Sequence, residues 1–129
     1  MPRAKQLTAW VTDRPGMLGE IGNALGAKKA NIRAFVATVE GGRGAIRVVV
    51  DKTAVARKVF KSNGWETTEE EVLQVTLGDK PGALGKLGEK LAAAGVNITY
   101  AYVGAGGGAR KANVYLGVSD MKAALKAAR

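Results

Sequence analysis

The sequence contains no cysteine and no histidine. Their absence excludes disulfide scaffolds, cysteine nucleophiles, Ser-His-Asp triads and the common structural zinc sites, all of which need one or both residues. Neither a calcium loop such as Asp-x-Asp-x-Asp-Gly nor a phosphate-binding loop such as G-x-x-x-x-G-K-[ST] is present. A hard-cation site built only from carboxylates stays possible, but no motif marks one. We therefore expect no catalytic residue, no metal site and no cofactor, and we predict that the chain is not an enzyme.

Long apolar runs are also missing. No stretch approaches the roughly 20 residues that a membrane-spanning helix needs, and the opening MPRAKQLTAWVTD lacks the apolar core of a signal peptide. We therefore expect a cytoplasmic protein that does not contact a membrane. The 129 residues fit one ordinary domain or two very small ones, and a hydrophobic share of 47% with 24% charged residues suits a folded globule.

Acidic residues are outnumbered by basic ones. There are 20 lysines and arginines against 11 aspartates and glutamates, which gives a net charge of +9. Residues 1–64 hold most of the excess, with 12 basic and 4 acidic side chains. Such a protein is attracted to polyanions at low salt. Because the basic residues are dispersed singly or in pairs, a solvated basic surface is the simpler interpretation.

Most of the chain is a duplication. With an offset of 66 residues, DRPGMLGEIGNALGAKKANI at 13–32 falls on DKPGALGKLGEKLAAAGVNI at 79–98, and ten of the 20 positions are identical. We interpret the chain as two copies of one supersecondary unit, at about residues 1–70 and 71–129.

Each copy shows the same order of elements, because strand-like alternation and helical spacing of apolar residues recur in the same places. In the first copy the pattern predicts strands at Leu7–Thr12, Asn31–Val39, Ala45–Val50 and Trp65–Glu71, with helices around Leu18–Leu25 and at Thr53–Ser62. In the second copy it predicts strands at Val72–Leu77, Asn97–Val103 and Ala112–Val118, with helices around Leu84–Leu91 and at Asp120–Ala128.

This order is typical of the ferredoxin-like βαββαβ unit. We expect an α+β fold in which each repeat forms an antiparallel sheet with its two helices on one face. One repeat length after Trp65 lies beyond Arg129, so the second repeat is predicted to lack its last strand. Its edge either stays open or is covered by another segment, and an open edge favours pairing with a second chain as a homodimer.

An Asp-x-Pro-Gly turn precedes the first helix of each copy. The leading N–H groups of a helix lack partners and favour an anion, and a glycine lets a small carboxylate approach them. A neighbouring aspartate accepts from an ammonium, and a nearby asparagine amide donates and accepts, so the set matches an α-amino acid. The structural alternative is that the aspartate caps the helix and the asparagine satisfies a turn. The residues concerned are Asp13, Gly16 and Asn31 in the first copy and Asp79, Gly82 and Asn97 in the second.

The pattern of a strand, D-[RK]-P-G-x-L-G-x-[IL], a helix and then a V/A-N-I strand resembles the ACT domain, the small regulatory module of many amino-acid biosynthetic enzymes. The likeness covers both repeats, and NITYAYVG in the second is similar to tandem members of that family. The resemblance implies a stand-alone tandem ACT protein that binds a small amino acid without catalysis. It also implies regulation through repeat or subunit interfaces and a regulated enzyme as partner.

The resemblance places ligand sites at interfaces between ACT units, formed by the first strand–helix turn and nearby strands. In the serine-regulated dehydrogenase branch an Asn precedes R-P-G, with a histidine two residues earlier. This chain has aspartate in place of the asparagine, and Val11 or Leu77 in place of the histidine. Both differences depart from the pattern for serine. The predicted ligand-binding residues are Asp13, Pro15, Gly16, Met17, Leu18, Asn31 and Ile32 in the first repeat and Asp79, Pro81, Gly82, Ala83, Leu84, Asn97 and Ile98 in the second.

Glycines recur along the first helix of each copy, although each costs about 1 kcal/mol relative to alanine inside a helix. They indicate either close approach of another backbone, such as the helix of the partner repeat, or close packing of the helix on its own sheet. Both interpretations stay open for Gly19, Gly22 and Gly26 and for Gly85 and Gly88.

The alternative function is that of a basic ferredoxin-like module which binds nucleic acid or a protein partner. RNA-recognition motifs share this order of elements, but they stack bases on aromatic side chains of a central strand. The matching strands here read AIRVVV and ANVYLGV, in which Tyr115 is the sole aromatic residue, so nucleic acid is not expected. Tyr100 and Tyr102 fall on the same strand face as Ile98, which favours packing in the core.

Overall fold

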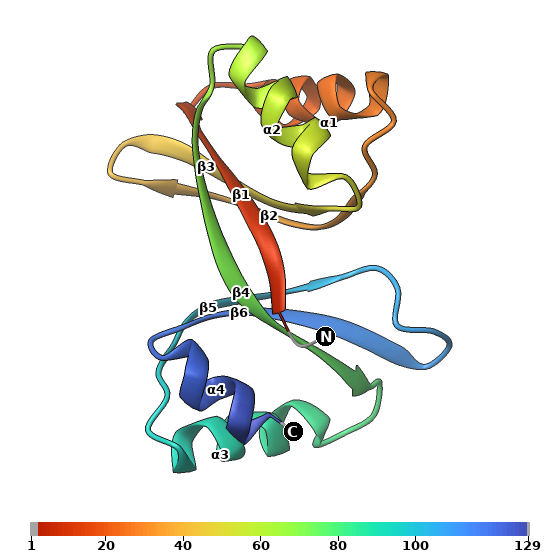
Figure 1. The fold of residues 1–129 in the computed structure, drawn as a ribbon, viewed down its shortest axis with the longest axis vertical. Coiled ribbons are helices and arrows are strands. Elements are labelled where there is room, and N and C mark those ends of the chain that lie inside the picture. Colours follow the sequence, from red (N-terminus) through yellow and green to blue (C-terminus); the bar gives the residue numbers. More distant parts are fainter. Residues whose placement is uncertain (1–2, 129) are drawn as a thin grey trace. The chain divides into compact units, whose positions relative to one another are not determined.

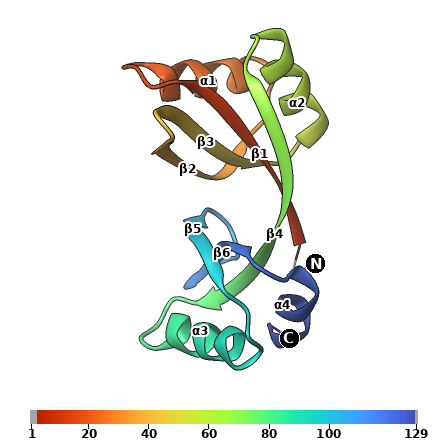
Figure 2. The same cartoon turned by 90° about the vertical axis from the view of Figure 1, so that its left-hand side faces the viewer.

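A computed structural model describes residues 3–128 of the chain (Figures 1 and 2). The alternation of strands and helices and the antiparallel pairing confirm the predicted α+β, ferredoxin-like fold class. Among the described residues, none of the helices combines the length and the apolar character that crossing a bilayer requires. The elements in chain order are β1 (Arg3–Thr12), α1 (Met17–Ala27), β2 (Ile32–Glu40), β3 (Arg43–Val50), α2 (Thr53–Ser62), β4 (Glu66–Gly78), α3 (Ala83–Ala93), β5 (Ile98–Gly104), β6 (Lys111–Val118) and α4 (Met121–Ala127).

The chain forms two compact units. The N-terminal unit is Lys5–Glu70, and the C-terminal unit is Glu71–Arg129 together with Met1–Ala4. Both boundaries fall inside strands, so β1 and β4 each contribute residues to both units.

The N-terminal unit has the strand order β2-β3-β1-β4, and α1 and α2 cover one face of this sheet (Figure 1). Leu7 and Phe35 both lie opposite Val48, each in antiparallel register. Because β1 and β2 both run antiparallel to β3, they are parallel to each other and end at the same end of the sheet. Ile21 and Phe60 are fully buried in the core between helices and sheet.

The C-terminal unit has the order β1-β4-β6-β5, with α3 and α4 on one face. Its core gathers apolar side chains of β4, β6 and α3, including Leu73, Leu91 and Leu116. Within the described residues no strand follows α4, and β1 occupies the place beside β4 that such a strand would take, with Arg3 Nη1 at 3.3 Å from Glu71 Oε1. Of the two predicted alternatives for this edge, coverage by another segment is the one observed, so the edge gives no reason for pairing with a second chain.

β4 is one continuous strand, where the sequence predicted two consecutive strands meeting at residues 71 and 72. No glycine or proline interrupts the polar run Glu69-Glu70-Glu71, so nothing in the backbone chemistry breaks the strand there.

A bulge in β5 overturns one prediction about its side chains. Ile98 lies opposite Val118, but the register then shifts by one and Tyr100 lies opposite Gly117. The rings of Tyr100 and Tyr102 therefore lie on the sheet face opposite to Ile98, away from α3 and α4. There Tyr102 stacks on Tyr115 with the ring centroids 5.5 Å apart. The expectation that both tyrosines share the face of Ile98 was wrong, because strict alternation does not anticipate a bulge.

The helix glycines face open space. Apart from the chain neighbours and the backbone of the same helix, a Cβ built on any of Gly19, Gly22, Gly26, Gly85 or Gly88 meets no atom within 4 Å. Close packing of the helix on its own sheet is therefore the wrong interpretation of these glycines, and contact with another backbone stays a prediction.

Candidate functional site

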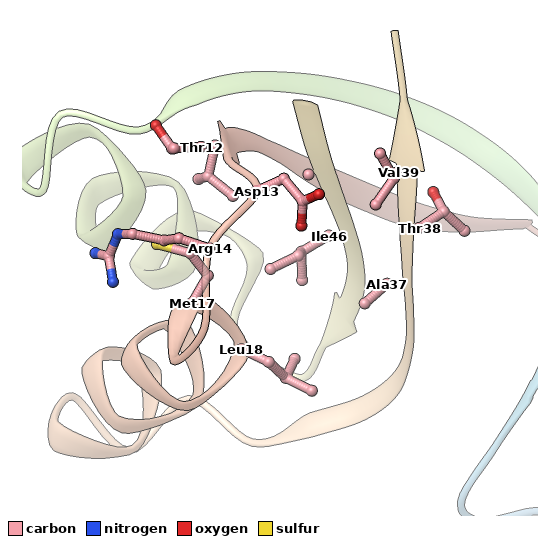
Figure 3. Close-up of a pocket in the computed structure, with 11 residues that line it drawn as sticks. Thr12, Asp13, Arg14, Met17, Leu18, Ala37, Thr38, Val39 and Ile46 are labelled. Atoms are coloured by element: carbon pink, nitrogen blue, oxygen red, sulfur yellow. The ribbon is translucent and has the colours of Figure 1, made fainter. Parts of the chain in front are cut away.

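Two pockets occupy matching places in the two units. The N-pocket, of about 300 Å³, lies between the end of β1, the start of α1 and the β2–β3 hairpin (Figure 3). The C-pocket, of about 320 Å³, lies between the end of β4, the start of α3 and the β5–β6 hairpin. Both are at the small end of the range for ligand pockets. The N-pocket is lined by Val11, Thr12, Asp13, Arg14, Met17, Leu18, Ala37, Thr38, Val39, Gly44 and Ile46. The C-pocket is lined by Leu77, Gly78, Asp79, Lys80, Ala83, Leu84, Ala101, Tyr102, Val103, Ala112 and Val114.

The Pro-Gly turn gives each pocket its helix start. Gly16 has φ 90° and Gly82 has φ 85°, a left-handed conformation that strains any residue with a Cβ. In the described structure neither helix start receives a side-chain cap, so Asp13 and Asp79 do not cap α1 and α3. The capping interpretation of these aspartates is therefore wrong, and both residues line the pockets instead.

The neighbouring side chains Asp13 and Arg14 point in different directions. Figure 3 shows the Asp13 carboxylate turned towards β3 and β2, and the Arg14 guanidinium turned to the other side of the turn. Arg14 Nη2 lies 2.6 Å from Glu20 Oε2 in an ion pair on α1. The N-pocket thus presents a carboxylate against the aliphatic wall that Ile46 and Ala37 provide.

The two predicted asparagines lie elsewhere in each unit. Thr12, next to Asp13, lies opposite Arg43, whereas Ile32, next to Asn31, lies opposite Val50. Arg43 and Val50 are at the two ends of β3, about 20 Å apart, so the aspartate and the asparagine lie at opposite ends of the sheet. Asn31 fixes the start of β2, where its backbone N–H donates to Asp51 Oδ1 at 2.8 Å.

The C-terminal unit repeats this arrangement. Leu77 lies opposite Ala112 and Ile98 opposite Val118, and the Asn97 N–H donates to Ser119 Oγ at 2.9 Å. The expectation that one small turn gathers the acid, the helix start and the amide is therefore wrong within a unit.

The predicted site residues thus divide into two groups in each unit. One group meets at the pocket: Asp13, Met17 and Leu18, flanked by Pro15 and Gly16, and Asp79, Ala83 and Leu84, flanked by Pro81 and Gly82. The other group lies at the far end of the sheet: Asn31 and Ile32, and Asn97 and Ile98. That either group binds a ligand stays a prediction.

Sequence reasoning missed the hairpin side of the pockets. Ala37, Val39 and Ile46 form the wall of the N-pocket, and Val103 and Val114 do so in the C-pocket. The signal that could have found them is topological. In this fold β1 and β2 flank β3 and run parallel to each other, so both end at the same end of the sheet. The turn after β1 must therefore face the end of β2.

A charged group fixes Thr38 at the rim of the N-pocket. The Thr38 hydroxyl donates to Glu40 Oε2 at 2.6 Å, and Arg47 Nη2 donates to Glu40 Oε1 at 3.1 Å. The hydrogen bonds from Arg47 and Thr38, with the charge of Arg47, lower the pKa of Glu40 to about 2. Glu40 is therefore ionised at neutral pH, and Thr38 is held by it.

Residues 5–61 match the family model of the ACT domain. The match lies inside the N-terminal unit and includes every residue that lines the N-pocket. The matched range includes the turn at 13–16 on which the sequence resemblance rests.

The chain is also similar to solved structures along nearly its whole length. Protein BT0572 from Bacteroides thetaiotaomicron is 29% identical, with 97% of this chain and 85% of that chain covered and a TM-score of 0.87. The regulatory subunit of aspartate kinase from Thermus flavus is 17% identical, with coverage of 99% and 91% and a TM-score of 0.69. The regulatory subunit of aspartate kinase from Thermus thermophilus, in a ligand-free form, is 19% identical, with coverage of 98% and 90% and a TM-score of 0.66. At such identities the two regulatory subunits show a shared fold alone. No curated relative matches the chain.

Proposed function

We propose that this chain is a non-catalytic regulatory protein that binds a small amino acid at the turns leading into α1 and α3. The observation that carries the proposal is the pair of pockets, each lined by an aspartate and by aliphatic side chains, of which one lies within the ACT match. A carboxylate beside an apolar cavity suits a ligand with an ammonium group and a modest side chain.

The chemistry of each pocket assigns a role to its parts. Asp13 or Asp79 accepts hydrogen bonds from the ligand ammonium, and the hairpin wall receives the ligand side chain. The ligand carboxylate faces the start of α1 or α3, where backbone N–H groups favour an anion. We take the two units as tandem ACT-like repeats, since both pockets occupy the same place in a repeated sequence.

Regulation follows if the ligand binds one arrangement of the protein better than another. The similar regulatory subunits of aspartate kinase support an enzyme as the partner that receives this signal. We therefore propose a regulated enzyme partner, and we propose no partner of another chemical class.

We also propose a homodimer, for a reason other than the missing strand. β2 and β5 are edge strands of their units, and they carry Phe35 and Val103 with exposed fractions of 49% and 61%. An exposed apolar edge favours pairing with a second copy. Light scattering across a concentration series should give twice the monomer mass, and a monomer at every concentration would contradict the dimer.

The structure does not favour the nucleic-acid alternative. Tyr102 and Tyr115 stack on each other and have exposed fractions of 8% and 1%, so their faces are not offered to bases. A gel shift with RNA or DNA at physiological salt should show no complex.

A panel of amino acids tests the proposal. At least one should raise the melting temperature and release or absorb heat in calorimetry, because a ligand at 100 times its Kd adds about 2.7 kcal/mol of stability. The variants Asp13→Asn and Asp79→Asn should weaken this effect. Glu89→Gln removes the same charge from an exposed position on α3 that lines neither pocket, and it should leave the effect unchanged. If no amino acid shifts melting or gives heat at millimolar concentration, the proposed function is wrong.

A further inference from the structure

Resting on the proposed function, we infer that the two pockets are not equivalent. The C-pocket is the principal site, and its ligand is an amino acid with an aliphatic side chain whose carboxylate is held by Lys80. Three differences between pockets at matching places in the repeat carry this inference.

The first difference is in the charges at the rim. In the N-terminal unit Arg14 is held in its ion pair with Glu20. One repeat later these two positions are Lys80 and Lys86, and neither lysine has an ion-pair partner within residues 3–128. A ligand carboxylate at the N-pocket must compete with Glu20 for Arg14, whereas at the C-pocket the cation is available.

The second difference is access. A Cβ built on Gly16 would lie 4.0 Å from both Arg14 Nη1 and Glu20 Oε2, so the ion pair lies against the start of α1. A Cβ built on Gly82 meets nothing within 4 Å. The aliphatic stem of Lys80 packs on Gly78, a lining residue of the C-pocket: a Cβ built on Gly78 would lie 3.6 Å from Lys80 Cε. Lys80 itself lines the C-pocket, and nothing obstructs the start of α3 at Gly82.

The third difference is the lining. Thr12 and Met17 of the N-pocket are replaced by Gly78 and Ala83 in the C-pocket. Apart from Tyr102, whose ring lies on the opposite face of the sheet, the wall of the C-pocket is aliphatic, from Leu77, Leu84, Val103 and Val114, with no threonine among its lining residues. Leu84 and Val103 have exposed fractions of 63% and 61%, so a ligand side chain would remove both from water. An aliphatic amino acid fits this lining better than a hydroxylated one.

The test introduces into one pocket the ion pair of the other. Lys86→Glu places an acid where Glu20 stands in the first unit, so that it pairs with Lys80. We expect L-leucine, titrated calorimetrically into the full chain, to bind this variant more than about tenfold more weakly than wild type. Lys90→Glu makes the same change of charge in the last turn of α3, away from the pocket, and should change the affinity less than about twofold. L-leucine amide, which lacks the carboxylate, should bind wild type as weakly as L-leucine binds Lys86→Glu.

Melting curves of each variant without ligand establish that it is folded, and L-serine tests the side-chain class by binding more weakly than L-leucine. The inference is wrong if Lys86→Glu and Lys90→Glu bind equally well, if Asp13→Asn abolishes binding while Asp79→Asn does not, or if L-serine binds more tightly. Each of these results leaves amino-acid binding intact. Absence of binding by every amino acid in the panel would instead overturn the proposed function.

Discussion

Arg47 and Glu40 form a two-pronged contact across the β2–β3 hairpin, in which the guanidinium donates from both terminal nitrogens to the two carboxylate oxygens. The Arg47 side chain is only 11% exposed, so much of its charge is removed from water and depends on this acid. The contact fixes the rim of the N-pocket through Thr38.

The pKa of Glu40 predicts how stability changes in acid. The folded value is about 2 against an ordinary value of 4.5, so Glu40 stabilises the fold at neutral pH and this contribution is lost as pH falls from about 4.5 towards 2. Glu40→Gln should therefore be less stable than wild type at pH 7, and the difference should shrink by pH 3. Urea unfolding at both pH values measures it. A difference that stays constant would show that the carboxylate charge is not responsible.

The two kinds of glycine should respond in opposite directions to alanine. Gly16→Ala places a Cβ on a left-handed backbone with φ 90° and should destabilise the N-terminal unit by about 1–2 kcal/mol. Gly19→Ala adds a Cβ to a regular helical turn with open space around it and should stabilise by up to about 1 kcal/mol. Chemical denaturation of both variants decides the sign. A loss of stability in Gly19→Ala would indicate that another chain contacts this face of α1.

Truncating a side chain to alanine should cost more stability on the buried face of α1 than on its exposed face. Ile21 is 0% exposed, and Ile21→Ala should cost about 2–5 kcal/mol because it removes packed atoms and leaves a cavity. Leu18 is 44% exposed at the N-pocket, so Leu18→Ala should cost well under half as much. Equal losses in denaturant unfolding would mean that Leu18 is covered in solution.

Gly117 of β6 lies so close to Tyr100 of β5 that the stability lost on mutating Gly117 to alanine should depend on the tyrosine ring. A Cβ there would lie 2.5 Å from two ring carbons of Tyr100, so Gly117→Ala must displace the ring and should cost about 1–3 kcal/mol. In the background of Tyr100→Ala the same change should cost less, because the obstructing ring is gone. Additive losses in the double variant would refute this cause.

The sequence was informative where one local rule decides the structure. The bounds of α2 matched the prediction because its apolar spacing ends at the Asn63-Gly64 stop, and Gly64 has a φ of 73°. The duplication also located both Pro-Gly turns, since their left-handed glycines are a local requirement.

The sequence was uninformative where distant segments decide. A one-residue bulge moved Tyr100 to the other face, and no local signal marked it. The distance between Asp13 and Asn31 follows from the parallel course of β1 and β2, which sequence proximity to a turn does not reveal. In the second repeat, the strand β4 pairs with β1, which lies nearly 70 positions earlier in the chain. The contact of Arg3 with Glu71 is an example.

That last contact bears on how this protein can be dissected. Arg3 and Ala4 belong with Glu71–Arg129, so a recombinant fragment cut at the repeat boundary separates the second half from residues it folds with. A fragment that begins at Glu71 should fold poorly on its own, and supplying the first residues as a synthetic peptide should restore it. The order of translation then matters, because Arg3 leaves the ribosome 68 residues before Glu71, the neighbour that it contacts.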